Sequence, residues 1–105
     1  MSEPAQGEVW WAEAPDTKGR PYLVVTRSEA IPVLRTVVAA PVTRTVRGIP
    51  SEIPLGPDEG LAGESVAATD ALLAIPKMML VRRMGALGPA RRHELCASLR
   101  AMADC

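Results

Sequence analysis

The sequence predicts a mainly β fold, a small barrel of about six strands with one amphipathic helix at the C-terminus. Its 105 residues suit a single domain, 1–105, with one core. Prolines recur throughout the first 89 residues, so no helix longer than about three turns has room before Pro89. Because only Trp10, Trp11 and Tyr22 are aromatic and there is no Phe, we expect an aliphatic core.

Short strand-like segments follow one another at regular spacing within residues 7–88. The six candidates are 7–13 (GEVWWAE), 20–27 (RPYLVVTR), 34–43 (LRTVVAAPVT), 49–55 (IPSEIPL), 64–71 (ESVAATDA) and 82–88 (RRMGALG). The second and third are apolar at successive positions, which is typical of strands covered on both faces. Segment 56–63 (GPDEGLAG) is predicted to be a loop without phosphate-binding character, because a strand follows it. The acidic stretch 52–64 is expected to be solvated.

The C-terminal segment predicts a helix over residues 89–103. Pro89 suits the first helical position, and Leu95, Leu99 and Met102 recur at i, i+4 and i+7 on one face. The single histidine, His93, points away from that face, so we expect it to be solvated.

The N-terminus MSEPAQGEV contains no apolar stretch that could act as a signal peptide, and no apolar run exceeds the six residues of VVAAPV. We therefore expect a cytoplasmic protein with no membrane contact. Cys96 and Cys105 lie nine residues apart, half a turn out of phase and ~13 Å apart on a helix, so they cannot bridge each other. They are expected to be reduced thiols, with Cys105 open to oxidation between molecules.

The net charge of zero hides a segregated pattern. Residues 1–17 and 48–70 carry acids and no base, whereas 18–47 and 77–100 each carry six bases and one acid. If the two basic stretches meet in space, they form an anion-binding face; otherwise the alternation only keeps the surface soluble. All 12 basic residues except Lys18 and Lys77 are arginines, which suits bidentate phosphate binding or reflects a GC-rich genome.

The sequence does not contain the residues that metal centres and Ser/His/Asp active sites require. With one histidine, two distant cysteines and no close pair of carboxylates on a strand, neither a metal centre nor a Ser/His/Asp arrangement has its parts. Any catalysis is therefore expected to use no metal, no cofactor and no histidine base.

One arginine occupies a constrained position. Gly19 is expected to let the chain turn, and Pro21 fixes the strand entry, so Arg20 is held at a barrel rim with little freedom. The next strand ends in Thr43. If the two strands are antiparallel neighbours joined by 28–33, Arg20 and Thr43 lie side by side.

Three sequence blocks together resemble the MazF/PemK (Kid) toxins of bacterial toxin-antitoxin pairs. The blocks are GEVWWAEAPDTKGRPYLVVTR, VVAAPVTRT and GLAGESVAATDALLAIPKMMLVRRMGALG, and the similarity runs from about residue 7 to 103. The resemblance implies an SH3-like barrel with a C-terminal helix, a homodimer, and metal-independent, sequence-specific cleavage of single-stranded RNA. In this resemblance Arg20 and Thr43 match the family's catalytic arginine and threonine.

The sequence departs from the family pattern in two places. The loop after Lys18 is shorter than is usual in the family, and Ala71 and Leu73 stand where the family carries Gln and Arg. Since the chain has no arginine at position 73, we expect cleavage to depend more heavily on Arg20.

The expected partners are single-stranded RNA (messenger, transfer or ribosomal), a cognate antitoxin and a second copy of the chain. The candidate RNA-binding residues are Lys18, Gly19, Arg27, Arg44, Arg47 and Trp11. Trp10 and Trp11 project to opposite sides of one strand, so one belongs to the core. The other is free to stack on a base, anchor the antitoxin or pack on the rim.

Two other functions remain open at this point. One is a toxin of the same fold that poisons DNA gyrase by binding, without cutting RNA. The other is an SH3-like peptide-binding module, which is disfavoured because a polyproline groove needs several aromatic residues.

Overall fold

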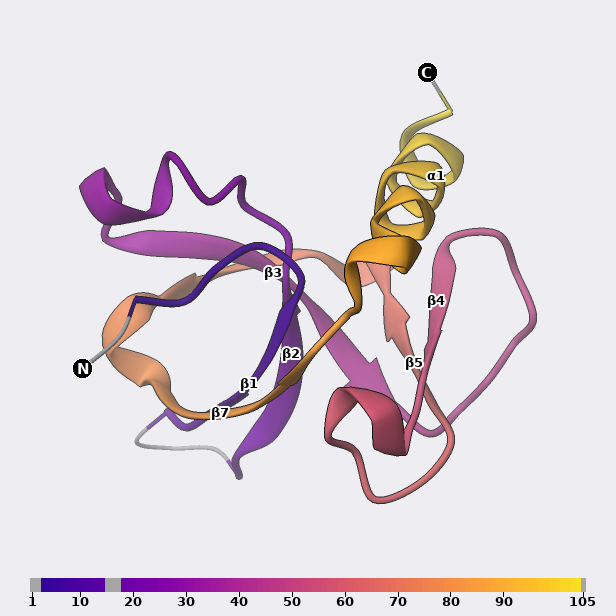
Figure 1. The fold of residues 1–105 in the computed structure, drawn as a ribbon, viewed down its shortest axis with the longest axis horizontal. Helices are drawn as coiled ribbons and strands as arrows, with labels where there is room; N and C mark the ends of the chain where they lie inside the picture. Colours follow the sequence, from indigo (N-terminus) through magenta and orange to yellow (C-terminus); the bar gives the residue numbers. More distant parts are fainter. Residues whose placement is uncertain (1–2, 15–17, 105) are drawn as a thin grey trace.

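The computed structural model describes residues 3–14 and 18–104, which form a curled antiparallel sheet with one helix at the C-terminal end (Figure 1). The strands are β1 (Glu8–Ala12), β2 (Arg20–Val24), β3 (Thr36–Thr43), β4 (Glu52–Leu55), β5 (Ser65–Ala68), β6 (Leu73–Pro76) and β7 (Leu80–Ala86). The α-helix is α1 (Arg92–Ala103), and five short 3-10 turns are η1 (Ile31–Val33), η2 (Pro57–Glu59), η3 (Thr69–Ala71), η4 (Lys77–Met79) and η5 (Pro89–Arg91).

The sheet runs in the order β4-β5-β3-β2-β1-β7, and β3 is the strand that joins its two halves. One edge of β3 pairs with β2, while its other edge pairs first with β6 and then with β5. Two consecutive short strands therefore share one long partner. β6, on the outer edge of β3, is joined to β7, on the outer edge of β1, by η4 alone.

The predicted mainly β class with a C-terminal helix is confirmed, and the structure has seven strands where about six were expected. The structure adds β6, and the segment expected as one strand over 64–71 ends at Ala68, where η3 turns the chain toward β6. The strand was missed because Leu73 and Ala74 are exposed and Pro76 ends it, so its pairing with β3, rather than a local pattern, defines it. The helix begins at Arg92 because η5 occupies 89–91.

The central strands contribute buried side chains on both faces, as their apolar runs predict, although Val38 of β3 is 39% exposed. On one face Leu23, Ala40 and Val42 join a cluster that includes Leu95 of α1. On the other face Val24, Val37 and Ala39 join a cluster that includes Trp10. The expected single aliphatic core is therefore two layers divided by the sheet, and one of them holds a tryptophan that is only 7% exposed.

Helix α1 lies against the sheet through the face that its periodicity predicts. Leu95 is buried, and Leu99 and Met102 are half-buried on the same side. The helix also buries Ser98, whose carbonyl accepts a hydrogen bond from the Thr69 hydroxyl at 3.3 Å. His93 is exposed, as expected, and Cys96 is exposed as well. Cys105 lies outside the described residues.

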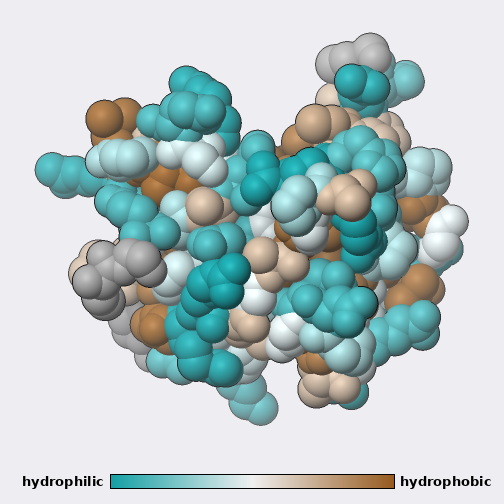
Figure 2. All heavy atoms as spheres, in the orientation of Figure 1, coloured by the Kyte–Doolittle hydropathy of each residue, from teal (hydrophilic) through white to brown (hydrophobic). Residues whose placement is uncertain are grey.

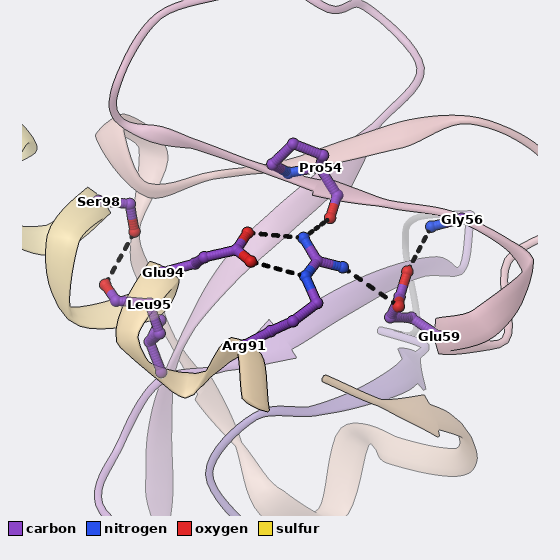
Figure 3. Close-up of polar contacts among 7 residues, drawn as sticks. All are labelled: Pro54, Gly56, Glu59, Arg91, Glu94, Leu95 and Ser98. Atoms are coloured by element: carbon purple, nitrogen blue, oxygen red, sulfur yellow. Dashed lines mark hydrogen bonds and ion pairs between the residues drawn. The ribbon is translucent and has the colours of Figure 1, made fainter. Parts of the chain in front are cut away.

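Arg91 joins four elements at the start of the helix (Figure 3). Its guanidinium donates to both carboxylate oxygens of Glu94 at 2.7 and 2.9 Å, to the Pro54 carbonyl at 2.6 Å, and to Glu59 at 3.2 Å. Glu59, whose side chain is 7% exposed, also accepts the Gly56 N–H at 2.7 Å. The expectation of a fully solvated 52–64 stretch is therefore wrong for Glu59, because Arg91 compensates its buried charge.

These contacts set the ionisation of the pair. Hydrogen bonding to Glu94 raises the pKa of Arg91, and the same hydrogen bonds from Arg91 lower the pKa of Glu94. The charge of Arg91 is thus paired within the fold, although this residue belongs to the second basic stretch of the sequence.

Glu8 ties the start of β1 to β7 and gives the protein an acid-sensitive contact. Its carboxylate accepts the Ala5 N–H at 2.8 Å, the Trp10 indole N–H at 2.9 Å and the Arg83 Nε–H at 2.9 Å. Burial acts to raise the pKa of Glu8, but the hydrogen bonds from Trp10, Arg83 and Ala5 outweigh it, so the pKa lies below the ordinary 4.5.

We expect Glu8→Gln to lower the free energy of unfolding at pH 7 by about 1–2 kcal/mol, because hydrogen bonds to a charged acceptor are lost. A lowered carboxyl pKa contributes stability that is complete above the unfolded value, 4.5, and is lost as the pH falls through the folded value. The difference between wild type and variant should therefore shrink below pH 4.5. Urea unfolding at several pH values measures it, and a difference that stays constant down to acid pH would contradict the assignment.

Within the described residues, no helix is long and apolar enough to cross a membrane, and no three His, Cys, Asp or Glu side chains are grouped as metal ligands.

Candidate nucleic-acid interface

The pairing of β2 with β3 brings Arg20 and Thr43 together. Tyr22 lies opposite Pro41 and Val24 opposite Ala39, so continuing the register by two residues places Arg20 opposite Thr43. The Arg20 guanidinium donates to the carbonyl of Val42, the residue before Thr43, at 3.1 Å. The adjacency expected from antiparallel strands is therefore present.

Arg20 is exposed and positioned by two contacts. Besides the Val42 carbonyl, its guanidinium carbon lies 5.8 Å from the centre of the Tyr22 ring, within the range of a cation–π interaction. It forms no ion pair with any residue in the described part of the chain. Since neither contact neutralises its charge, the guanidinium is available to an anion from solvent.

The hydroxyl of Thr43 is oriented by the backbone that follows it. It accepts the Thr45 N–H at 3.1 Å, and the side chain is half-buried at the end of β3. Because that bond uses a lone pair, the hydroxyl proton is left for another acceptor. Arg20 and Thr43 thus offer donors from adjacent strands.

Gly19, the residue before Arg20, has a packing role that the sequence did not predict. Gly19 was expected to provide a turn, but its φ lies outside the left-handed region that favours glycine, and a Cβ there would overlap the indole of Trp11. The glycine allows close packing rather than a turn. The indole N–H of Trp11 donates to Glu13 at 2.9 Å. Trp11 is half-buried, whereas Trp10 belongs to the core, as expected for one of the pair.

The other candidate phosphate-binding residues are all exposed but are not all near Arg20. Lys18 lies two residues before it, and Arg44 follows Thr43 and lies over Gly63. Arg47 belongs to the connection 44–51, where its N–H donates to Glu52 at 3.0 Å. Arg27 lies beyond the far end of β2, whose four steps of ~3.3 Å alone span ~13 Å. The structure therefore does not bring Arg27 to the Arg20 end.

The two basic stretches meet only in part. On β7, Arg82 lies opposite Trp11, which in turn lies opposite Pro21, so Arg82 is one strand removed from β2. Its neighbour Arg83 is paired with Glu8 at 2.9 Å. Figure 2 shows a largely hydrophilic face broken by separate apolar patches. The exposed cations that flank the Arg20–Thr43 pair in the chain are thus Lys18 and Arg44.

A groove of about 250 Å³ lies beside the Arg20 end of the sheet. Its polar side chains are Glu13, Lys18 and Tyr22, and Leu73 and Met79 contribute to its apolar wall. Tyr22 connects it to the Arg20 guanidinium. Sequence reasoning did not single out Glu13, Tyr22 or Met79 as site residues. The available signal was the acidic side chain directly after β1, close in sequence to Lys18.

The chain matches, over residues 5–103, the family described as PemK-like, MazF-like toxins of type II toxin-antitoxin systems. It belongs to the PemK/MazF toxin family. Among its relatives, "Probable endoribonuclease MazF5" of Mycobacterium tuberculosis is 38% identical over 103 residues, covering 97% of this chain and 94% of the relative. "Endoribonuclease MazF3" of the same species is 41% identical over 82 residues, covering 78% of this chain and 80% of the relative.

Solved structures agree with the PemK/MazF assignment. "Mycobacterium tuberculosis toxin MazF-mt6" superposes with a TM-score of 0.85 at 33% identity, covering 92% of this chain and 96% of that one. "Endoribonuclease in complex with its cognate antitoxin from Mycobacterial species" gives a TM-score of 0.83 at 25% identity, covering 96% and 95%. The SH3-like barrel expected from the resemblance is thus the fold of this PemK/MazF chain.

Ala71 and Leu73, the two residues that differ from the PemK/MazF pattern, lie at different places in the fold. Ala71 is exposed in η3, whereas Leu73 begins β6 opposite Ala39 and is 41% exposed at the groove. Where the family pattern leads one to expect a second cation, this PemK/MazF chain presents an apolar side chain. Arg20 is therefore left as the cation between the groove and Thr43.

Proposed function

We propose that this PemK/MazF chain is the toxin of a type II toxin-antitoxin pair and acts as a metal-independent, sequence-specific endoribonuclease on single-stranded RNA. In this function it works in the cytoplasm as a homodimer, stops translation and growth, and is neutralised by its antitoxin. The curated relatives named as endoribonucleases, and the solved relative described with its cognate antitoxin, support this function. They favour RNA cleavage over the gyrase-poisoning alternative.

The observation that carries the proposal is the juxtaposition of Arg20 with Thr43, with the arginine charge unpaired among the described residues. RNA supplies its own nucleophile. The 2′-hydroxyl loses its proton to water as its oxygen attacks the adjacent phosphorus, the bond from phosphorus to the 5′-oxygen breaks, and the 5′-oxygen takes up a proton from water, so the products are a 2′,3′-cyclic phosphate and a 5′-hydroxyl. The protein needs only to orient the phosphate and to stabilise the charge that develops on it.

Each of the two side chains has a role that its environment permits. The Arg20 guanidinium donates to the non-bridging oxygens as negative charge builds on them. The Thr43 hydroxyl, held by the Thr45 N–H, donates its free proton to the same phosphate and fixes its orientation. Both donors are preorganised by β2 and β3, so little reorganisation is needed when the charge develops.

Neighbouring phosphates are bound by the exposed cations around this pair. Lys18 and Arg44 flank Arg20 and Thr43 in sequence, and Gly19 sets the path of the backbone between Lys18 and Arg20. Arg27 and Arg47 bind phosphates of the RNA that lie farther from the scissile phosphate. Because such contacts release counterions, the affinity for RNA should fall steeply as salt rises.

A single 2′-deoxy substitution tests this mechanism. We expect the purified protein to cut a single-stranded RNA oligonucleotide in the presence of EDTA, and the 5′ ends of the products locate the cut. Replacing the ribose on the 5′ side of that phosphate by deoxyribose should abolish cleavage there, since the nucleophile is gone. The same substitution two nucleotides away is the control. Cutting of the substituted phosphate would contradict 2′-oxygen attack, and RNA left intact throughout would favour the gyrase-poisoning alternative.

A further inference from the structure

We propose that the groove beside Arg20 binds the base of a nucleotide flanking the scissile phosphate, and that Glu13 selects a base with adjacent N–H donors, guanine above all. This inference rests on the proposed function and names the part of its substrate that the groove recognises. It assigns to Glu13 a role in specificity and to Trp11 a role in positioning Glu13.

The groove has the size and lining of a site for one base. Its volume is about 250 Å³, and its walls combine the ring of Tyr22 with aliphatic side chains that include Leu73, Ile75 and Met79. A flat, weakly hydrated base gains from stacking and apolar contact in such a site, whatever its identity. The polar groups that could distinguish one base from another are the Glu13 carboxylate, the Lys18 ammonium and the Tyr22 hydroxyl.

The groove is close enough to the phosphate-binding residues to take a base from the same stretch of RNA. Tyr22 lines the groove, and the Arg20 guanidinium lies 5.8 Å from the centre of its ring. Lys18 lines the groove two residues before Arg20. A nucleotide whose phosphate meets Arg20 therefore needs only to turn its base toward Tyr22 to enter the groove.

The Glu13 carboxylate is held in place although it is exposed. One oxygen, Oε2, accepts the Trp11 indole N–H at 2.9 Å, and the Glu13 backbone N–H donates to the Met79 carbonyl at 2.9 Å. Trp11 in turn is packed against Gly19, where no side chain would fit. The other oxygen, Oε1, accepts no hydrogen bond from the described part of the chain. A fixed carboxylate with a free oxygen is a preorganised acceptor for a ligand.

The chemistry of the bases then decides the preference. A carboxylate only accepts hydrogen bonds, and guanine presents two adjacent donors, N1–H and the exocyclic amino group, on one edge. The Lys18 ammonium, which only donates, suits the neighbouring O6 of guanine. Cytosine and adenine present an amino group without a second adjacent donor. Uracil presents one N–H between two carbonyl oxygens, which a carboxylate repels.

The test uses RNA that is not cleaved, so that binding is measured apart from chemistry. After the cut is mapped, the scissile position is made 2′-deoxy, and the bases on its two sides are varied in turn among guanine, inosine, cytosine, adenine and uracil. We expect the wild-type protein to bind guanine on one side about tenfold more tightly than uracil, which lies within the range of about 5- to 150-fold that a bidentate pair provides. Inosine, which lacks the exocyclic amino group, should lie between them.

The matched variants are Glu13→Gln and Glu29→Gln, which remove the same charge inside and outside the groove. Glu13→Gln should reduce the guanine-to-uracil ratio to about one to threefold, because the amide offers a donor as well as an acceptor. Glu29→Gln should leave the ratio unchanged. A second pair places a bulky side chain in the groove or elsewhere on the surface: Leu73→Trp should weaken binding of all the oligonucleotides, and Val33→Trp, at an exposed residue outside the groove, should not.

The outcomes separate this inference from the proposed function. If the wild-type protein cuts RNA but binds all the bases equally, or if Glu13→Gln keeps the full guanine preference, the base site is refuted while RNA cleavage stands. If the protein cuts no RNA, the same series of bases is placed at the centre of an uncleavable 2′-deoxy oligonucleotide; a guanine preference there that Glu13→Gln removes supports the base site although the proposed function fails, and equal binding of all bases refutes both.

Discussion

Replacing Arg20 by alanine is expected to lower the rate of RNA cleavage by roughly 100- to 1,000-fold, the usual effect of removing one preorganised donor to a developing oxyanion. The guanidinium has no ion-pair partner in the described part of the chain, so its charge is not needed to satisfy another residue of the fold. Its removal should therefore leave the sheet intact. Single-turnover cleavage of one RNA oligonucleotide, with thermal unfolding as the check on folding, measures the effect.

Two matched variants make the Arg20 result specific. Arg20→Lys keeps the charge but loses the paired donors, so its rate should lie between those of wild type and Arg20→Ala. Arg27→Ala removes an exposed arginine beyond the far end of β2 and should weaken RNA binding without a comparable loss of rate. Near wild-type cleavage by a folded Arg20→Ala protein would refute the role assigned to this arginine.

Leu95→Ala is expected to lower the free energy of unfolding by about 2–5 kcal/mol, the range for leucine truncation in a protein core. Leu95 is 1% exposed and joins helix α1 to a cluster to which β1, β2, β3, β4 and β5 all contribute. The polar contacts of Arg91 and Ser98 hold the same helix but cannot fill the cavity that the substitution leaves.

Cys96→Ala is the matched control for this prediction. It truncates the next residue of the same helix, which is exposed, and should change the free energy of unfolding by less than about 0.5 kcal/mol. Urea unfolding followed by tryptophan fluorescence reports both variants. Equal effects of the two substitutions would show that α1 does not contribute to the core in the way described.

The ion pairs of Glu8 with Arg83 and of Arg91 with two glutamates show that a run of basic residues in the sequence does not by itself identify an anion-binding surface. In sequence, Arg83 and Arg91 belong to a basic stretch that was a candidate for anion binding. In the fold, each is paired with a glutamate, and Arg91 contacts β4 and η2 as well as its own helix. The carboxylates of Glu8 and Glu59, which pair with Arg83 and Arg91, are distant in sequence, so the sequence alone does not show that these two arginines are already paired.

The chain itself determined the class of fold and the central pair of the site. Apolar runs in β2 and β3 required cover on both faces, and the helical face of α1 followed from Leu95, Leu99 and Met102. Because β2 and β3 are neighbouring antiparallel strands, the start of one had to lie beside the end of the other, and this brings Arg20 to Thr43.

The tertiary structure decided what surrounds that pair. That β6 is a strand follows from its pairing with β3, and the packing of Trp11 on Gly19, which orients Glu13 toward the groove, has no local signature. The physical reason is common to these cases. Periodicity and turn residues report how a segment meets solvent and its nearest neighbours, whereas strand sharing, close packing and the pairing of charges depend on which distant segments meet once the sheet has curled.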